Sequence, residues 1–334
     1  MAAHTSLDGP KSAFYYRFWI IVFSLGVFAL LATLYIATKK VEYTWRWNRV
    51  PQYFLYEEKV DIRAEMEGEI GTIETHGQDV RVLIRGGDGE EAHILPKTSL
   101  ILGQGDYVYP GDIVGSFTHL KPGILVEGLL LTLEVSFLAI IFGIVLGLFA
   151  GLARISKNPA LRWGAITYIE LIRGSPLLVQ IFLWYFVVGT VINTMLSQYG
   201  MGQISPLWFG VMALAIFTGA YTAEIVRAGI QSVHRGQMEA ARSLGMSYPQ
   251  AMCKVILPQA FRRILPPLAG QFISLVKDSS LLGVISIREL TKASREVVTS
   301  SLQPFEIWIV CAILYLVLTF ALSMFVQYLE RKAI

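Results

Sequence analysis

Charged side chains are scarce in this sequence, which argues against an ordinary soluble protein. Asp, Glu, Lys and Arg make up 16% of the 334 residues, whereas soluble domains average about 25%. The uncharged residues form long blocks, of which Phe18 to Ala37 is the first and Gly174 to Ala223, with fifty residues, is the longest. A membrane span needs about 20 mostly apolar residues. The blocks therefore predict several membrane-spanning helices.

Three further absences limit the function. The net charge is only +3 and no long run of Lys and Arg is present, so we expect no nucleic acid among the partners. The two cysteines, Cys253 and Cys311, are too few for a disulfide framework or a cysteine-based zinc site. No Gly-x-x-x-x-Gly-Lys-Ser/Thr segment occurs, which excludes the phosphate-binding loop of an ATPase. We expect neither a metal nor a cofactor on this chain.

The uncharged runs predict six spans, near residues 18–38, 124–153, 172–193, 207–229, 264–287 and 307–329. The third and fourth share the longest block and are separated by the polar segment 197–203. The fifth is interrupted by Lys277 and Asp278. The first span has no small-x-small cleavage site after it, so we expect it to be retained. The fold class is mainly α, that of a polytopic membrane protein.

The basic loops predict the orientation of the spans. Loops 154–163 and 231–265 carry a clear excess of Lys and Arg, which places them in the cytoplasm by the positive-inside rule. Six spans then leave both termini in the cytoplasm and residues 40–120 outside. Lys39 and Lys40 oppose this assignment mildly, but long segments cross the membrane largely regardless of charge. We expect a multi-pass protein of the bacterial plasma (inner) membrane.

The outward segment has a different pattern. From Lys59 to Thr118 polar residues alternate with β-branched ones and are interrupted by Gly/Asp turns, which predicts five to seven short strands. Segments 67–71 and 109–115 resemble hairpins of small barrel and barrel-sandwich modules related to biotinyl and lipoyl carriers. No lysine stands at a carrier tip, so a spacer or docking module is favoured over a carrier. We expect a small all-β soluble domain of barrel or barrel-sandwich type.

These patterns together predict three parts. An N-terminal tail and first span cover 1–39, and the outward β-rich domain covers 40–120. A five-span core covers 121–334, with a cytoplasmic loop at 231–263.

A sharp bend between two short helices is predicted in the cytoplasmic loop. Residues 237–244 are good helix formers, and Gly245 suits the left-handed position after a helix. Ser247 and Gln250 have the spacing of a capping box. Pro258 is expected to end the second helix at the preceding residue.

This elbow, residues 237–257, offers a charged anchor with small neighbours. Glu239 is followed by Ala240 and Ala241, whose small side chains allow another surface to approach closely. From the residues alone, a rigid lever that fits a groove on a soluble partner and an ordinary amphipathic loop are equally supported.

The spacing of the elbow resembles the characteristic loop of ABC importer permeases. Glu-Ala-Ala, three residues, Gly, nine residues and Val-x-Leu-Pro follow one another here, with Val255 where Ile is commoner. Segments 171–180, 221–230 and 275–282 also look like the polar amino-acid branch of that family, which includes histidine, glutamine and glutamate permeases. The resemblance covers about 124–329 and does not include the first span or the β-domain.

The resemblance implies a mechanism and a set of partners. Two permease copies, identical or paralogous, would enclose a pathway for an amino acid that an outer solute-binding protein delivers. A separate ATP-binding subunit would carry ATP and Mg, and the elbow would transmit its closure to the spans in the membrane lipid. The residues implied in ATPase coupling are Glu239, Ala240, Ala241, Gly245, Leu257 and Pro258.

Ionisable residues within or next to the spans are candidates for the substrate pathway. A charge at the bilayer centre costs about 2.5–3.5 kcal/mol on insertion scales, so it normally faces protein or water. Glu224 stands three residues before Arg227. Three alternatives stay open: an ion pair between them, a Glu224 that binds the α-ammonium or a cationic side chain of an amino acid, and an Arg227 that extends to the interface.

The other pathway candidates carry less distinctive patterns. Glu170 and Arg173 are also three residues apart, which predicts an interfacial ion pair. Lys277 and Asp278 are adjacent and cannot share a helix face, so they predict a local break or a gate contact. The full set of candidates is Glu224, Arg227, Glu170, Arg173, Gln180, Lys277 and Asp278. Gly143, Gly147 and Gly151 form a small-residue stripe that predicts close helix packing.

Other functions remain as alternatives to an amino-acid permease. An intramembrane enzyme would need a nucleophile with a base, or a metal site, within the spans. The histidines are His4, His76, His93, His119 and His234. All of them lie outside the predicted spans, and no His-Glu-x-x-His segment occurs. A membrane anchor that presents the β-domain would leave the elbow and five spans without a role. Within transport, a solute other than an amino acid is a further alternative.

Overall fold

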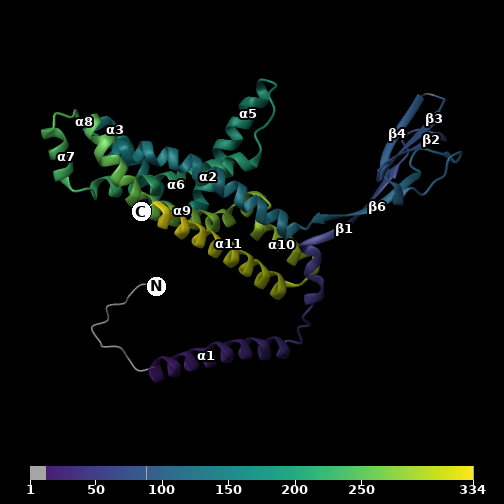
Figure 1. Cartoon of the computed structure of the whole chain (residues 1–334), viewed down its shortest axis with the longest axis horizontal. Coiled ribbons are helices and arrows are strands. Elements are labelled where there is room, and N and C mark those ends of the chain that lie inside the picture. Colours follow the sequence, from purple (N-terminus) through teal and green to yellow (C-terminus); the bar gives the residue numbers. More distant parts are fainter. Residues whose placement is uncertain (1–12, 88, 334) are drawn as a thin grey trace. The chain divides into compact units, whose positions relative to one another are not determined.

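The computed structural model describes residues 13–87 and 89–333, which divide into two compact units, Met1–Trp47 and Asn48–Ile334. The first unit consists mainly of α1 (Ala13–Lys40), a single apolar helix (Figure 1). Its segment Phe14–Lys40 is long and apolar enough to cross a membrane. Lys39 and Lys40 in its last turn complement the helix dipole. The predicted domain division at residues 39 and 120 stays a prediction.

The β-rich part begins after two short 3-10 turns. Its strands are β1 (Leu55–Arg63), β2 (Gly68–His76), β3 (Asp79–Gly86), β4 (Gly89–Pro96), β5 (Tyr107–Val108) and β6 (Ile113–Pro122). β1 and β6 form an antiparallel two-stranded ribbon, and the other four form a sheet in the order β4-β3-β2-β5. Alternate residues of these strands, including Ile70, Val82 and Ile84, fill a small apolar core. Strand alternation in the sequence predicted this β-domain.

The form of the β-domain is only partly as predicted. The described residues of this segment contain six strands, where five to seven were expected. Among the described residues, the strand pairings form a ribbon and an open four-stranded sheet, so the barrel or barrel-sandwich form is not confirmed. Gly68 at the start of β2 allows one close approach, since a Cβ there would lie 2.4 Å from the carbonyl oxygen of Arg85 on the neighbouring strand.

The helical core follows β6. Its longer helices are α2 (Ile124–Arg154), α3 (Pro159–Arg173), α6 (Pro206–Gln231), α9 (Leu257–Asp278), α10 (Leu290–Ser301) and α11 (Pro304–Ala333). The shorter ones are α4 (Leu177–Phe182), α5 (Thr190–Gln198), α7 (Arg235–Ser243) and α8 (Tyr248–Ala251). π-helical segments Leu183–Gly189 and Met252–Ile256 connect α4 to α5 and α8 to α9, and a 3-10 segment, Ser279–Ile285, follows α9.

Six helices of the described chain are long and apolar enough to cross a membrane, as predicted, but two begin elsewhere. The third span is Leu177–Gln198 and not 172–193. The residues before Gly174 belong to the separate helix α3, which ends at Arg173 because Gly174 and Pro176 follow it. The fifth span begins at Tyr248 and not near 264. The segment between the fifth and sixth spans contains α10.

The centre of the core is the seam between α2 and α6. The glycine stripe of α2 lies against Thr218, Thr222 and Val226 of α6, and a Cβ at Gly147 would stand 2.4 Å from the Thr222 Cβ. The predicted close packing is therefore confirmed, since only glycine fits this approach. Figure 1 shows α2, α6 and α9 running side by side.

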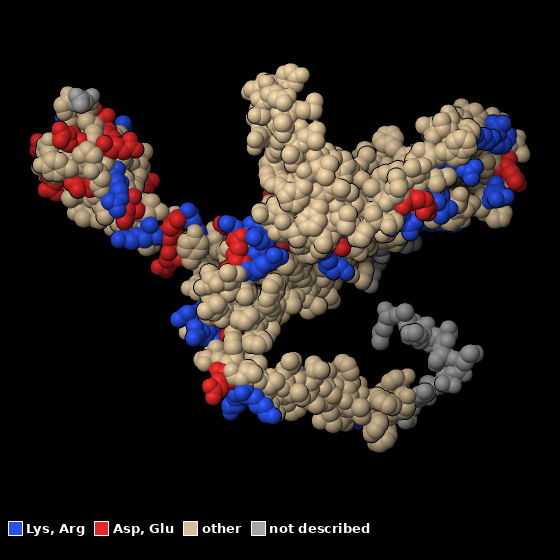
Figure 2. Space-filling view, turned by 180° about the vertical axis from the view of Figure 1, so that it is seen from behind, with Lys and Arg blue, Asp and Glu red and all other residues tan. Residues whose placement is uncertain are grey.

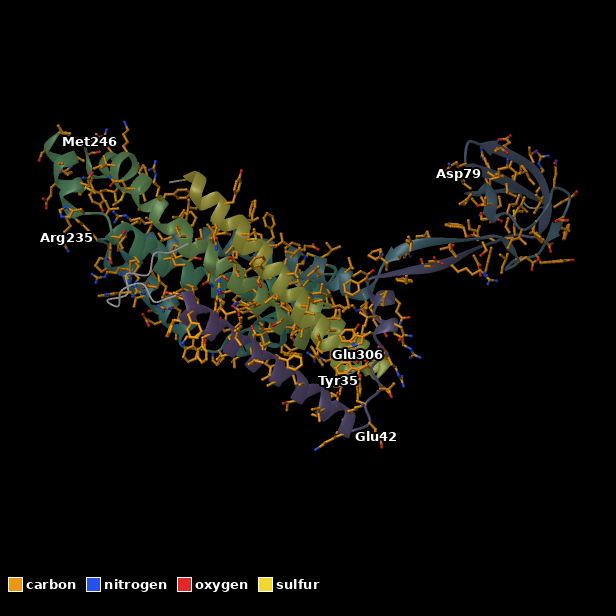
Figure 3. All side chains as sticks on the ribbon, turned by 60° about the horizontal axis from the view of Figure 1, so that its bottom comes forward. Tyr35, Glu42, Asp79, Arg235, Met246 and Glu306 are labelled. Carbon is orange, nitrogen blue, oxygen red and sulfur yellow. The ribbon has the colours of Figure 1, made fainter. Side chains whose placement is uncertain are left out.

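Charge is distributed unevenly over the core. Figure 2 shows a broad uncharged surface over the helices, with Lys and Arg side chains gathered at the end that carries α7. Arg235 and Met246, which bracket α7, lie at one end of the core in Figure 3, and Glu306 at the start of α11 lies at the other. An uncharged band between charged ends is the distribution expected of a membrane protein.

Candidate functional site

The elbow has the local structure that the sequence predicts. α7 ends before Gly245, which adopts φ +84 in the left-handed region. Ser247 then begins the next helix with a complete capping box: its backbone N–H donates to Gln250 Oε1 at 2.9 Å, and its hydroxyl accepts from the Gln250 N–H. The two arms are joined by a hydrogen bond from the Gln259 side-chain amide to Gln237. These bonds fix the angle of the bend.

The predicted end of the second helix at Pro258 is wrong. α8 passes through the π-helical segment 252–256 and continues directly into α9, with Pro258 near its start. Proline lacks the N–H that would bond to a carbonyl one turn earlier, and the wider π turn accommodates that loss. The Gln259 side chain donates to the Val255 carbonyl oxygen at 2.9 Å. The elbow is therefore joined to a membrane span by continuous helix.

Several side chains of the elbow are exposed on the surface. Glu239 and Ala240 are exposed, whereas Ala241 is buried and holds α7 against the rest of the core. Leu244 is 81% exposed at the tip of the bend. Glu239, Ala240 and Leu244 are therefore accessible to a second protein.

A charge cluster lies where α2, α3 and α6 meet. Glu224 Oε2 accepts hydrogen bonds from Arg227 Nη2 at 2.9 Å and from its Nε at 3.1 Å, so the ion pair, one of the three alternatives, is present. Glu224 Oε1 also lies 2.6 Å from Arg154 Nη1. Both oxygens of this carboxylate are thus neutralised by arginine. That arrangement favours the structural ion pair over a Glu224 that binds an ammonium group.

Arg154 is the member of this cluster that the sequence analysis missed. It is the last residue of α2 and stands three residues after Gly151, which packs against Val226 of α6. Residues three and four apart share a helix face. Continuing the glycine stripe by one step would have placed Arg154 beside the end of α6 and so beside Glu224.

The predicted ion pair between Glu170 and Arg173 is not formed. Glu170, whose side chain is 64% exposed, instead lies 3.6 Å from Arg154 Nη2. The Arg173 guanidinium lies over the ring of Tyr221, 5.2 Å from the ring centre. Each member of the predicted pair thus has another partner. Glu170 lies near Arg154, which also contacts Glu224, and the face of the Tyr221 ring attracts the Arg173 cation.

Gln180 and the pair Lys277–Asp278 occupy other positions. Gln180 is buried and its side-chain amide donates to the Ile172 carbonyl at 2.7 Å and to Ser175 Oγ at 2.9 Å. It therefore ties the end of α3 to α4. α9 ends at Asp278 and passes into the 3-10 segment Ser279–Ile285 within the same candidate span, so the predicted local break or gate contact stays a prediction. Lys277 is exposed and lines a groove of about 280 Å³ between α9 and α11.

Glu289 is a buried carboxylate that the sequence analysis did not single out. It begins α10 and accepts hydrogen bonds from the backbone N–H groups of Thr291 and Lys292, at 2.7 and 2.8 Å. The Tyr315 hydroxyl of α11 donates to it at 3.0 Å. Burial raises the pKa of the Glu289 carboxyl above its usual value, although these hydrogen bonds oppose the shift. Glutamate is an uncommon N-cap, which is why no sequence signal marked it.

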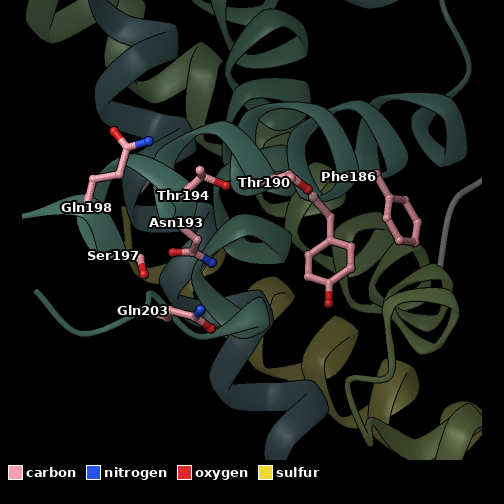
Figure 4. Close-up of a pocket in the computed structure, with 9 residues that line it drawn as sticks. Phe186, Thr190, Asn193, Thr194, Ser197, Gln198 and Gln203 are labelled. Carbon is pink, nitrogen blue, oxygen red and sulfur yellow. The ribbon is translucent and has the colours of Figure 1, made fainter. Parts of the chain in front are cut away.

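A polar, uncharged groove of about 490 Å³ lies along the C-terminal half of the third candidate span (Figure 4). Thr190, Asn193, Thr194 and Ser197 recur on one face of α5 and point into it, and Gln203 faces them from the following loop. The Asn193 side chain is also bonded to both backbone groups of Ile204. Polar residues on one face of a span favour contact with water or protein over lipid.

The chain matches a known protein family over its core. The family profile described as binding-protein-dependent transport system inner membrane component matches residues 143–334. This range contains the elbow, Glu224 and the last four candidate spans, and it begins after the β-domain.

Several known proteins are similar to this chain. The probable glutamine ABC transporter permease protein GlnM of Bacillus subtilis is 43% identical over 206 residues, which are 62% of this chain and 91% of the relative. The L-cystine transport system permease protein TcyB of the same organism is 39% identical over 210 residues, 63% and 86% of the two chains. A solved structure described as an amino acid ABC transporter with histidines is 42% identical, with a TM-score of 0.55, and the match covers 63% of this chain and 94% of that one.

Proposed function

Because this chain belongs to the family of binding-protein-dependent transport system inner membrane components, we propose that its elbow couples a separate ATPase to amino-acid import. The chain is a permease subunit of an ABC importer, a membrane protein with several spans and no ATPase activity of its own. This function replaces the enzyme and anchor alternatives. The residue roles, the orientation and the solute assigned to it are proposals.

The continuous helix through Pro258 supports the coupling role most directly. A push on α7 is carried through the capped bend and the π-helical segment into α9 without a flexible joint. Rigid transmission of this kind is what the closure of two ATPase subunits requires to move membrane spans. We assign the contact with the ATPase to Glu239, Ala240 and Leu244, which are exposed on the elbow. ATP and Mg would bind to that partner.

The assembly around the chain follows from this role. Two permease copies, identical or paralogous, would enclose the pathway, and an outer solute-binding protein would load it. The elbow and the basic loops would face the cytoplasm, with both termini, and the β-domain would face outward as a spacer or docking module. The bilayer would surround the uncharged band seen in Figure 2.

We propose a polar amino acid as the solute, with an uncharged side chain favoured. The named relatives carry glutamine or cystine by their descriptions, and the α5 groove offers hydroxyl and amide groups but no charge. Glu224 supports the pathway by holding α2 and α6 together through Arg154 and Arg227, and Gln180 by fixing the start of the third span. Lys277 and Asp278 stand where the fifth span passes from α-helix into a 3-10 segment.

The coupling role is tested by Glu239→Lys in the complex reconstituted with its ATPase and solute-binding protein. We expect loss of solute-stimulated ATP hydrolysis, because a reversed charge stands at the contact, with normal insertion of the chain. Glu57→Lys makes the same charge change at an exposed position on β1 and should leave stimulation intact. Stimulated hydrolysis that survives Glu239→Lys unchanged would contradict the coupling assignment.

A further inference from the structure

A second feature of the charge cluster is a groove of about 510 Å³ beside it, between the end of α6 and α9. Its polar lining comes from Arg173, Glu224, Arg227, Ser232 and Arg263. Three of these five side chains are arginines and only one is acidic. What the groove can bind depends on which of these charges are already balanced.

Glu224 and Arg227, which both line the groove, are already paired with each other. Glu224 holds Arg227 with one oxygen and Arg154 with the other. The remaining terminal nitrogen of Arg227, Nη1, donates to the Gln231 side chain. Each oxygen of Glu224 therefore already contacts an arginine, which weakens its attraction for a solute ammonium group, and Arg227 has little capacity for another partner.

The two remaining arginines have no acidic partner. Arg173 contacts the Tyr221 ring with its face, which leaves the N–H groups at its edge available. Arg263 donates from Nη1 to the Ser232 carbonyl oxygen. Among the side chains that the structure describes, neither guanidinium lies within 4 Å of a carboxylate.

The local balance of charge is positive. Three guanidinium groups and one carboxylate line the groove, so two positive charges remain. Arg154 and Glu170, which are ion-paired behind Glu224, add one charge of each sign and leave that balance unchanged. The wall also contains apolar groups, among them Pro267, which lower the local dielectric constant and strengthen the attraction for an anion. A guanidinium presents a fork of N–H donors that matches the two oxygens of a carboxylate or phosphate.

We propose that this groove binds an oxyanion, a carboxylate or a phosphate group, between Arg173 and Arg263. The α-carboxylate of the transported amino acid and the phosphate of an anionic lipid headgroup share this chemistry. The solute source rests on the proposed import function, whereas the lipid source does not. In either case two pathway candidates change roles: Arg173 binds the ligand, and Glu224 keeps Arg227 in place.

The test uses the complete importer complex with Arg173→Gln, Arg263→Gln and the double variant. Arg162→Gln is the matched control, because Arg162 is an exposed arginine of α3 that does not line the groove. The first arm measures equilibrium binding of L-glutamine and of its α-carboxamide to the complex in detergent. The second arm measures thermal unfolding in nanodiscs with and without phosphatidylglycerol.

For a solute carboxylate, each single variant should weaken L-glutamine binding about tenfold, the effect of one lost charge-assisted hydrogen bond. The double variant should no longer prefer L-glutamine over the carboxamide. For a lipid phosphate, phosphatidylglycerol should stabilise the unmodified complex and Arg162→Gln but not the double variant. Arg→Lys at either position should retain part of the effect, since it keeps the charge but loses the fork.

The proposal is overturned if the double variant keeps both responses within twofold of the unmodified complex, or if the unmodified complex shows neither response. Failure of the import function has a separate signature, the absence of solute-stimulated ATP hydrolysis in the unmodified complex. In that event the lipid arm alone decides whether the oxyanion site exists.

Discussion

Gly147→Ala should destabilise the core, because the α2–α6 seam has no space for a methyl group. The added Cβ would lie 2.4 Å from the Cβ and 2.5 Å from the Cγ2 of Thr222, and 2.8 Å from the carbonyl oxygen of Gly219. The contacted atoms are a backbone oxygen and a branched side chain close to its own backbone, so neither can move aside without shifting α6. Overpacking of this kind costs about 1–3 kcal/mol.

Gly164→Ala is the matched control, since a methyl group added to this helical glycine of α3 would meet nothing within 4 Å. It should be neutral or stabilising by up to about 1 kcal/mol through helix propensity. The assay is thermal unfolding of the purified chain in detergent. A loss of about 1–3 kcal/mol corresponds to a fall of several degrees in Tm for a chain of this size. Equal Tm values for the two variants would refute the tight-seam account.

Three further changes test individual contacts. Arg154→Gln leaves Glu224 with one arginine and should cost about 1–3 kcal/mol of unfolding free energy; a double-mutant cycle with Glu224→Gln should show coupling, and strictly additive costs would contradict the contact. Gly245→Ala places a side chain at φ +84 and should lower the local stability of the bend by about 1–2 kcal/mol. Amide hydrogen exchange in α7 should then be faster, and unchanged exchange would show that the bend does not depend on this residue. The raised pKa of Glu289 means that the folded chain binds this proton more tightly than the unfolded chain. The free energy of unfolding should therefore fall as pH rises from about 4.5 through the folded pKa. Glu289→Gln should reduce that pH dependence in thermal unfolding between about pH 4 and 8.

The sequence predicted those features that depend on short-range patterns. Apolar length predicted six spans and placed four of them closely, and the Ser247–Gln250 spacing predicted a capping box that is fully formed. Gly245 was assigned to the left-handed position that it adopts. Each of these is decided by residues close together in the chain.

Features that depend on tertiary partners were not predictable in the same way. Pro258 breaks an ordinary α-helix, and only the π-helical turn before it shows how the helix continues. Arg154 meets Glu224 across seventy positions of sequence because the glycine seam brings two helices together. Spacing predicted a partner for Arg173 on its own helix, but the ring of Tyr221 on α6 takes that place.

Site-specific photo-crosslinking from the elbow tests the coupling role most directly. Leu244, 81% exposed at the bend, and Leu302, 78% exposed between α10 and α11, are equally accessible leucines; the α7 elbow and the start of α11 lie at opposite ends of the core (Figure 3). With p-benzoylphenylalanine at each position in the intact complex, position 244 should crosslink to the ATP-binding subunit and position 302 should not. A crosslink to that subunit from 302, or none from 244, would contradict the account.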